Sequence, residues 1–286
     1  MTELEKSIIA TLGYFEIFNY PLDAKQIHKN LIDARADFDE VDLALKEMLN
    51  EGKIISKNNS YALPRREYLF PLKEKSLKLS IRKIKILKLA KLVLSLIPWV
   101  RGAILFGSLS IKNANELSDI DLMIIAKKGH VWTTRLFVKI ILTALLIGRK
   151  KNQEHAPNKI CPNHFVSEDC LEIPFQNIYN AMMYRNGVVV IDKGLNLRSE
   201  FFKKNPWIFK SDINSTYKEN FKKDIGHLSL LERLSKFIQV KIMTREAMDK
   251  ANSSQTRICD DYLAFHDLDR ESEIIHKVFH KLKLNN

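Results

Sequence analysis

Residues 104–126, ILFGSLSIKNANELSDIDLMIIA, constrain the fold of this chain more than any other segment. A short apolar run ends at Gly107-Ser108, and a second apolar run opens with Asp119 and Asp121. Short apolar runs bounded by turn residues are typical of buried β-strands. Because side chains alternate along a strand, the two aspartates fall on the same face. The segment therefore predicts an α/β core that brings two carboxylates together.

The paired carboxylates and the Gly-Ser turn point to one kind of chemistry. Neighbouring carboxylates repel each other unless a cation lies between them, and oxygen ligands suit Mg²⁺ or Mn²⁺. A glycine lets the backbone approach a ligand closely, and the N–H groups that follow it can form an anion-binding concavity. A phosphate-binding turn beside a divalent-cation site is what nucleotidyl transfer requires.

The stretch LFGSLSIKNANELSDIDLMII resembles the signature of the DNA polymerase β-like nucleotidyltransferase superfamily. The resemblance implies an α/β (α+β) core with a mixed sheet, Mg²⁺ or Mn²⁺ as cofactor and a nucleoside triphosphate, expected to be ATP, as substrate. It implies that Gly107 and Ser108 contact the triphosphate and that Asp119 and Asp121 hold the metal. Ser118 would help to open the second strand.

The sequence departs from the family pattern in two places. Many members carry a basic residue soon after Gly-Ser, and here only Lys112 could supply that charge. Active members usually carry a third carboxylate on a later strand, where it completes the metal site and often acts as general base. The corresponding segment KICPNHFVS (159–167) has no acidic residue, and Glu168, Asp169 and Glu172 follow it. We assign Asp169 as the candidate third catalytic carboxylate, and an incomplete site is the alternative.

Residues 1–64 predict three helices followed by a hairpin, an order that resembles the winged-helix domain of transcription regulators. In that family the third helix enters the DNA major groove. Here the third helix, from Phe38 to Glu51, has five acidic residues and one basic residue. DNA phosphates would repel it. We therefore expect a packing or protein-interaction module rather than a DNA-binding one.

Basic residues are concentrated immediately after this region. Residues 65–75 predict a linker, and an amphipathic helix is expected to begin at about Ser76 and to end before Pro98. Between Arg65 and Lys91 there are ten basic and two acidic residues, and the whole chain has a net charge of +12. This charge suggests an anionic partner such as a nucleotide, a nucleic acid or a membrane surface. A solvated lysine face on a packed helix is the simpler interpretation.

The remaining segments define the expected domain organisation. We expect the nucleotidyltransferase core over residues 76–192 and a C-terminal helical domain over residues 193–286, with helices near 227–251 and 270–284. The apolar run Leu136–Ile147 contains Lys139 and is too short to cross a bilayer. It predicts a buried helix, and surface association through the bases that follow it stays open.

The cysteines indicate a reduced protein. Cys161, Cys170 and Cys259 form no CxxC pair, and the N-terminus lacks the layout of an export signal, so a cytoplasmic location is expected. The spacing of His155, Cys161, His164 and Cys170 matches no zinc motif.

Together these patterns predict a metal-dependent nucleotidyltransferase that moves a nucleoside monophosphate, AMP from ATP, to an acceptor hydroxyl. The acceptor class stays open among a small molecule, RNA and protein. Two alternatives remain, a catalytically degenerate nucleotide-binding or scaffold protein and a winged-helix regulator.

Overall fold

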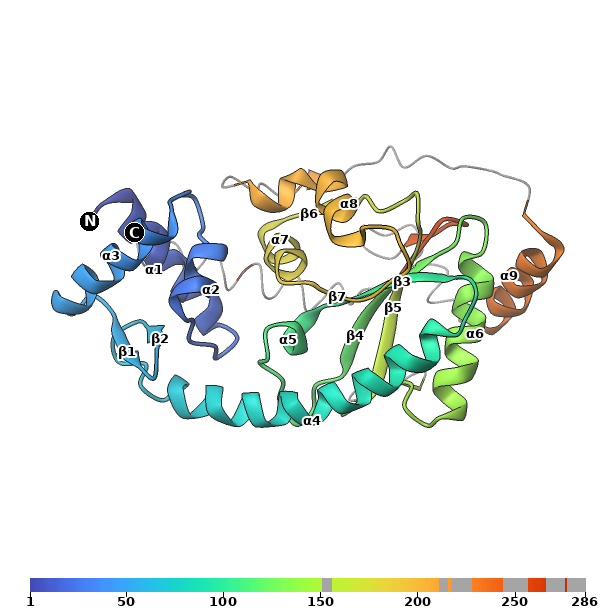
Figure 1. The fold of residues 1–286 in the computed structure, drawn as a ribbon, viewed down its shortest axis with the longest axis horizontal. Coiled ribbons are helices and arrows are strands. Elements are labelled where there is room, and N and C mark those ends of the chain that lie inside the picture. Colours follow the sequence, from blue (N-terminus) through green and yellow to red (C-terminus); the bar gives the residue numbers. More distant parts are fainter. Residues whose placement is uncertain (151–155, 211–215, 218–227, 244–256, 266–275, 277–286) are drawn as a thin grey trace. The chain divides into compact units, whose positions relative to one another are not determined.

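The computed structural model describes residues 1–150, 156–210, 216–217, 228–243, 257–265 and 276 (Figure 1). These residues form two compact units. The first contains residues 1–78 with 209, 210 and 276, and the second contains residues 79–208, 216–217, 228–243 and 257–265.

The first unit contains the predicted helices and hairpin in the predicted order. They are α1 (Glu3–Glu16), α2 (Ala24–Lys29), α3 (Phe38–Asn50), β1 (Ile55–Lys57) and β2 (Ser60–Ala62). Asn58 and Asn59 both have positive φ in the turn between the strands, as the type I′ turns of hairpins require. Helix α3 buries Val41, Leu45 and Met48, whereas most of its acidic residues are exposed. The negative charge of α3 therefore faces solvent.

Helix α4 (Leu69–Ser95) starts earlier than the sequence predicted. Residues 69–75 were expected to belong to a linker and are helical instead. Pro71 is compatible with this start because it is the third residue of the helix, where a backbone N–H has no intrahelical partner to lose. The helix begins in the first unit and continues in the second.

The second unit is built on a mixed six-stranded sheet with the order β7-β3-β4-β5-β10-β9. Its strands are β3 (Val100–Leu105), β4 (Ile120–Ala126), β5 (Ile160–Ser167), β7 (Val188–Asp192), β9 (Arg257–Ile258) and β10 (Tyr262–Ala264). Strands β4 and β5 are parallel and the other pairs are antiparallel. Helix α6 (Val131–Ala144) lies between β4 and β5 in sequence, which supplies the crossover that a parallel pair needs.

Helices cover both faces of this sheet (Figure 1). On one face, α4 contributes Leu87, Ala90 and Leu94, and α6 contributes Trp132 and Val138, to a single apolar core with the strands. On the other face, the Phe106 ring, just after β3, lies 5.0 Å from the Tyr184 ring of α7 (Ile178–Arg185) and 6.5 Å from the Phe201 ring of α8 (Leu197–Lys204). The predicted mixed α/β core is thus confirmed.

The smaller elements belong to the second unit, apart from Phe209 at the end of the 3₁₀ turn. They are α5 (Gly107–Ser110), the 3₁₀ turn η1 (Pro206–Phe209), the strand pair β6 (Phe175–Gln176) and β8 (Thr216–Tyr217), and α9 (Leu230–Ile242). Among the described helices, none combines the length and the apolar character needed to cross a bilayer.

The predicted boundary at residue 192 does not separate two bodies. Strand β10 pairs with β5 in the central sheet, so part of the expected C-terminal helical domain belongs to the core. The expected long helix is confirmed over Leu230–Ile242, between the caps Ser229 and Met243, and residues 244–251 of the expected range lie outside the described residues. The helix expected over residues 270–284 also lies outside them, apart from residue 276.

Candidate active site

The turn after β3 is shaped around Gly107. This residue has φ +68°, a conformation that side chains disfavour, and a Cβ placed on it would lie 2.8 Å from Oδ2 of Asp121. The backbone N–H of Phe106 donates to the backbone oxygen of Asp121 over 3.1 Å. A glycine is therefore favoured here for two reasons: the positive φ, and the close approach of the turn to β4.

Hydrogen bonds hold the Gly-Ser turn against the approach to β4. The Ser108 hydroxyl lies 3.3 Å from the Ser118 hydroxyl, which also accepts from the backbone N–H of Asn115 over 3.0 Å. The backbone N–H of Asn113 donates to the Ser108 backbone oxygen over 2.8 Å. Lys112 lies in the same loop with an exposed side chain. Four of the residues assigned from the sequence, Gly107, Ser108, Lys112 and Ser118, thus belong to one turn and loop.

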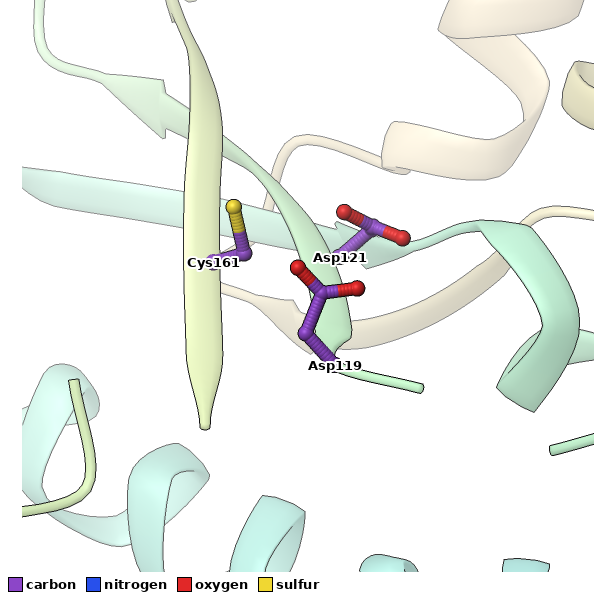
Figure 2. A group of neighbouring side chains, drawn as sticks. All are labelled: Asp119, Asp121 and Cys161. Atoms are coloured by element: carbon purple, nitrogen blue, oxygen red, sulfur yellow. The ribbon is translucent and has the colours of Figure 1, made fainter. Parts of the chain in front are cut away.

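Asp119 and Asp121 lie at the start of β4, as predicted, and a third side chain joins them. Strand register pairs Asp121 with Cys161 on the parallel strand β5. One ligand atom from each of the three residues lies within 4.8 Å of the others, and all three side chains are half-buried. Figure 2 shows the two carboxylates and the thiol gathered where β4 and β5 begin. The structure therefore forms a group of two oxygen donors and one sulfur donor.

Two further side chains contact this group. Nη1 of Arg149 lies 2.8 Å from Oδ2 of Asp119 and 3.7 Å from the Cys161 sulfur. The Asn163 amide nitrogen lies 3.4 Å from Oδ1 of Asp121. The backbone of Arg149 is fixed because its N–H donates to the backbone oxygen of Ile160 over 2.9 Å. The sequence had suggested Arg149 only as a base flanking an apolar run, and nothing local to it signalled a place in the site.

Burial, and then the neighbouring charges, set the protonation state of Cys161. Burial, together with the negative charges of Asp121 and Asp119, raises the pKa of the Cys161 thiol to about 12, although Arg149 opposes the shift. Burial lowers the pKa of Arg149, but its contacts with Cys161 and Asp119 outweigh this effect and raise it overall. At neutral pH the site thus contains a neutral thiol and a positively charged guanidinium.

Lys83 holds the loop that precedes Asp119 through two hydrogen bonds. This α4 side chain is buried, and its amine donates to the Ser118 backbone oxygen over 2.7 Å and to Oδ1 of Asn158 over 2.9 Å. Burial lowers the Lys83 pKa, and the nearby Asp119 charge opposes that shift. The sequence had placed Lys83 in a basic helix whose lysines were expected to face solvent. Lys83 is instead a buried donor that fixes the residue preceding Asp119.

The structure does not bring Asp169 to the paired aspartates. Cys161 and Ser167 lie at opposite ends of β5, about 20 Å apart at the usual strand rise, and Asp169 follows Ser167. The Asp169 carboxylate pairs with the Lys128 amine at 3.0 Å. The assignment of Asp169 as the third carboxylate is thus corrected, because the start of β5 presents Cys161 to Asp121.

The other acidic candidates do not fill the third position either. Glu168 pairs with Arg101 at 3.0 Å, also at the far end of β5. Glu172 is not part of the carboxylate and thiol group.

The described members of the histidine and cysteine set of residues 155–170 do not converge on one metal site, as their spacing predicted. Cys161 joins the aspartates, whereas His164 is buried and pairs in register with Met123 of β4 and Ala264 of β10. Cys170 follows the far end of β5, and His155 lies outside the described residues.

The cofactor implied by the family resemblance fits this donor set only in part. The two aspartate carboxylates suit Mg²⁺ or Mn²⁺, which prefer oxygen ligands. The third donor, the sulfur of Cys161, does not suit Mg²⁺.

The family comparison agrees with this geometry. Residues 86–155 match the family model described as "Nucleotidyltransferase domain", a range that includes β3, the Gly-Ser turn, β4 and α6. No curated protein and no solved structure matches the sequence. The chain therefore contains a nucleotidyltransferase domain, consistent with the DNA polymerase β-like superfamily that its Gly-Ser and Asp-x-Asp pattern resembles.

Proposed function

We propose that this protein transfers a nucleoside monophosphate, AMP from ATP, to a hydroxyl group of an acceptor in a reaction that depends on a divalent cation. The observation that carries the proposal is the close packing of the Gly107 turn against Asp121, with Asp119 two residues away, inside the segment that matches the nucleotidyltransferase domain. The turn would receive the triphosphate, and the two carboxylates would hold the cation.

Each residue has a role that follows from its place. Asp119 and Asp121 would hold the cation, which when bound would neutralise triphosphate charge and stabilise the departing pyrophosphate. Gly107 and Ser108 would offer backbone and hydroxyl donors to phosphate oxygens, and the absence of a Cβ at Gly107 lets this turn lie against Asp121. Lys112, which is exposed in the same loop, would bring a positive charge to these phosphates.

The acceptor hydroxyl needs a group to take its proton, and the described site offers no third carboxylate next to Asp121. This observation favours a second candidate function, a protein that binds nucleotide and cation without transferring the nucleotide. The two candidates share the binding step and differ in pyrophosphate release.

The test combines a binding measurement with a turnover measurement. ATP would be titrated into the full chain with and without Mg²⁺ or Mn²⁺, and pyrophosphate release would be followed in the presence of cell extract as a source of acceptors. For a transferase, Asp121→Asn reduces release by about 10²–10³-fold, the usual effect of removing one well-placed electrostatic group. The matched control is Asp169→Asn, which removes a carboxylate at the far end of β5 and leaves release unchanged.

The outcomes separate the candidates. Cation-dependent ATP binding without pyrophosphate release supports the binding protein. Release that survives Asp121→Asn contradicts the proposed transferase, as does a chain that binds no nucleotide.

A further inference from the structure

The donor set at the start of β4 and β5 is unusual for a Mg²⁺ site because one of its three members is sulfur. The parallel register that pairs Asp121 with Cys161 places the thiol where it shares a group with both carboxylates, within 4.8 Å. No side-chain rearrangement of β5 is needed to bring Cys161 there, because it is the second residue of β5 as Asp121 is the second residue of β4.

Ligand chemistry distinguishes the cations that such a site prefers. Mg²⁺ takes oxygen ligands in near-octahedral geometry and usually keeps several waters. Zn²⁺ and Co²⁺ accept thiolate together with carboxylate, and Zn²⁺ sites that act on substrates use three protein ligands and leave a further position open. Two carboxylates and one sulfur supply three protein ligands, so a substrate oxygen or a water can occupy the open position.

We propose that Asp119, Asp121 and Cys161 form a site for a sulfur-accepting divalent cation of the Zn²⁺ or Co²⁺ class, which it binds in preference to Mg²⁺. The inference rests on the proposed function only in using the same two aspartates. Cys161 binds as the thiolate, so the S–H bond breaks, its electron pair passes to the cation and the proton leaves to solvent. An incoming cation would also replace Arg149 as the positive partner of the Asp119 carboxylate.

A cobalt titration of the full chain tests this site directly. Metal-free protein would be titrated with Co²⁺ while the sulfur-to-cobalt charge-transfer absorption is recorded, and Zn²⁺ and Mg²⁺ would then compete for the same site. We expect the absorption band in the wild type, displacement by Zn²⁺, and binding of Co²⁺ and Zn²⁺ at least tenfold tighter than that of Mg²⁺.

Two serine variants locate the sulfur. Cys161→Ser keeps the size of the side chain but replaces sulfur with oxygen, so it loses the band and at least tenfold of the preference over Mg²⁺. Cys170→Ser is the matched control, because Cys170 is also half-buried but lies beyond the far end of β5. It keeps both the band and the preference. Cys161→Asp is expected to reverse the preference towards Mg²⁺.

Several results would overturn the proposal. They are a wild-type chain that binds Mg²⁺ as tightly as Zn²⁺, a chain that binds none of these cations, and a band or preference that survives Cys161→Ser. The failure of the proposed function looks different, since it appears as pyrophosphate release that Asp121→Asn does not change or as an absence of nucleotide binding. Sulfur ligation without turnover would support the cation site while contradicting the transferase.

Discussion

Nη1 of Arg149 lies 2.8 Å from Oδ2 of Asp119, so a guanidinium already neutralises one of the two carboxylates that would bind a cation. A divalent cation that binds Asp119 therefore competes with an ion pair that the protein makes with itself. The guanidinium belongs to the residue that follows Gly148, and its backbone is fixed to β5.

The first prediction concerns this competition. Arg149→Gln should tighten the binding of Mn²⁺ or Zn²⁺ by about fivefold, because the variant removes the competing charge. The effect is limited to about 1 kcal/mol since the Arg149 side chain is 35% exposed and water screens the pair. Isothermal titration of the metal-free chain measures it, with Arg149→Lys as the charge-preserving control. Weaker cation binding in Arg149→Gln would show that Arg149 supports the site instead of competing for it.

A second prediction isolates the close approach at Gly107. Gly107→Ala introduces both a positive-φ penalty and a Cβ that would lie 2.8 Å from Oδ2 of Asp121. The matched control is Gly129→Ala, whose residue has φ +69° but nothing within 4 Å of the added Cβ. Gly129→Ala should cost about 1 kcal/mol of unfolding free energy from φ alone, and Gly107→Ala about 2–3 kcal/mol. Thermal unfolding gives both values, and equal losses would contradict the packing of the turn on Asp121.

The local parts of this fold could be predicted from the sequence, and the pairing between them could not. The turn at Gly107 and the strand containing Asp121 follow from short patterns of residue type and alternation. The neighbour of Asp121 depends on the register of β5, which includes an irregularity between Leu122 and Met123. Parallel register is set by contacts between segments far apart in the sequence, so the place of Cys161 was not predictable.

Helix α9 shows a different limit of sequence patterns. Its periodicity alone would turn the apolar face inward, yet Glu232, Ser235 and Gln239 are the buried side chains of the helix. Leu230 and Phe237 are exposed by 84% and 56%. The reason is that the backbone at the start of α6 needs hydrogen-bond partners, which polar side chains of α9 supply.

The third prediction concerns the buried amine under the loop. Lys83→Met should lower the unfolding free energy by about 2 kcal/mol, because the Ser118 backbone oxygen and Oδ1 of Asn158 would lose their donor. Lys85→Met changes an exposed lysine on the same helix and should cost less than about 0.5 kcal/mol. Urea unfolding compares the two variants. If Lys83 positions the approach to Asp119, Lys83→Met should also weaken cation binding, whereas unchanged binding would limit Lys83 to a structural role.

The last prediction concerns Glu232, whose carboxylate accepts from the backbone N–H groups of Trp132 at 2.7 Å and Thr133 at 2.8 Å. Glu232→Gln offers one acceptor where two are needed, and the amide nitrogen would face a backbone N–H. The buried site should therefore lose about 2–3 kcal/mol of unfolding free energy. Glu200→Gln, in the first turn of α8 with a side chain 41% exposed, is the control and should be neutral within about 0.5 kcal/mol.

Hydrogen exchange distinguishes a local effect of Glu232→Gln from a global one. The expected result is faster hydrogen exchange at the amides of Trp132 and Thr133, with little change in the exchange rates of the sheet. This result would show that α9 holds the start of α6 through the Glu232 carboxylate. Unchanged exchange at those two amides would contradict the role of Glu232. Because α6 connects the strand of Asp121 to the strand of Cys161, loss of this contact is also expected to weaken cation binding in the variant.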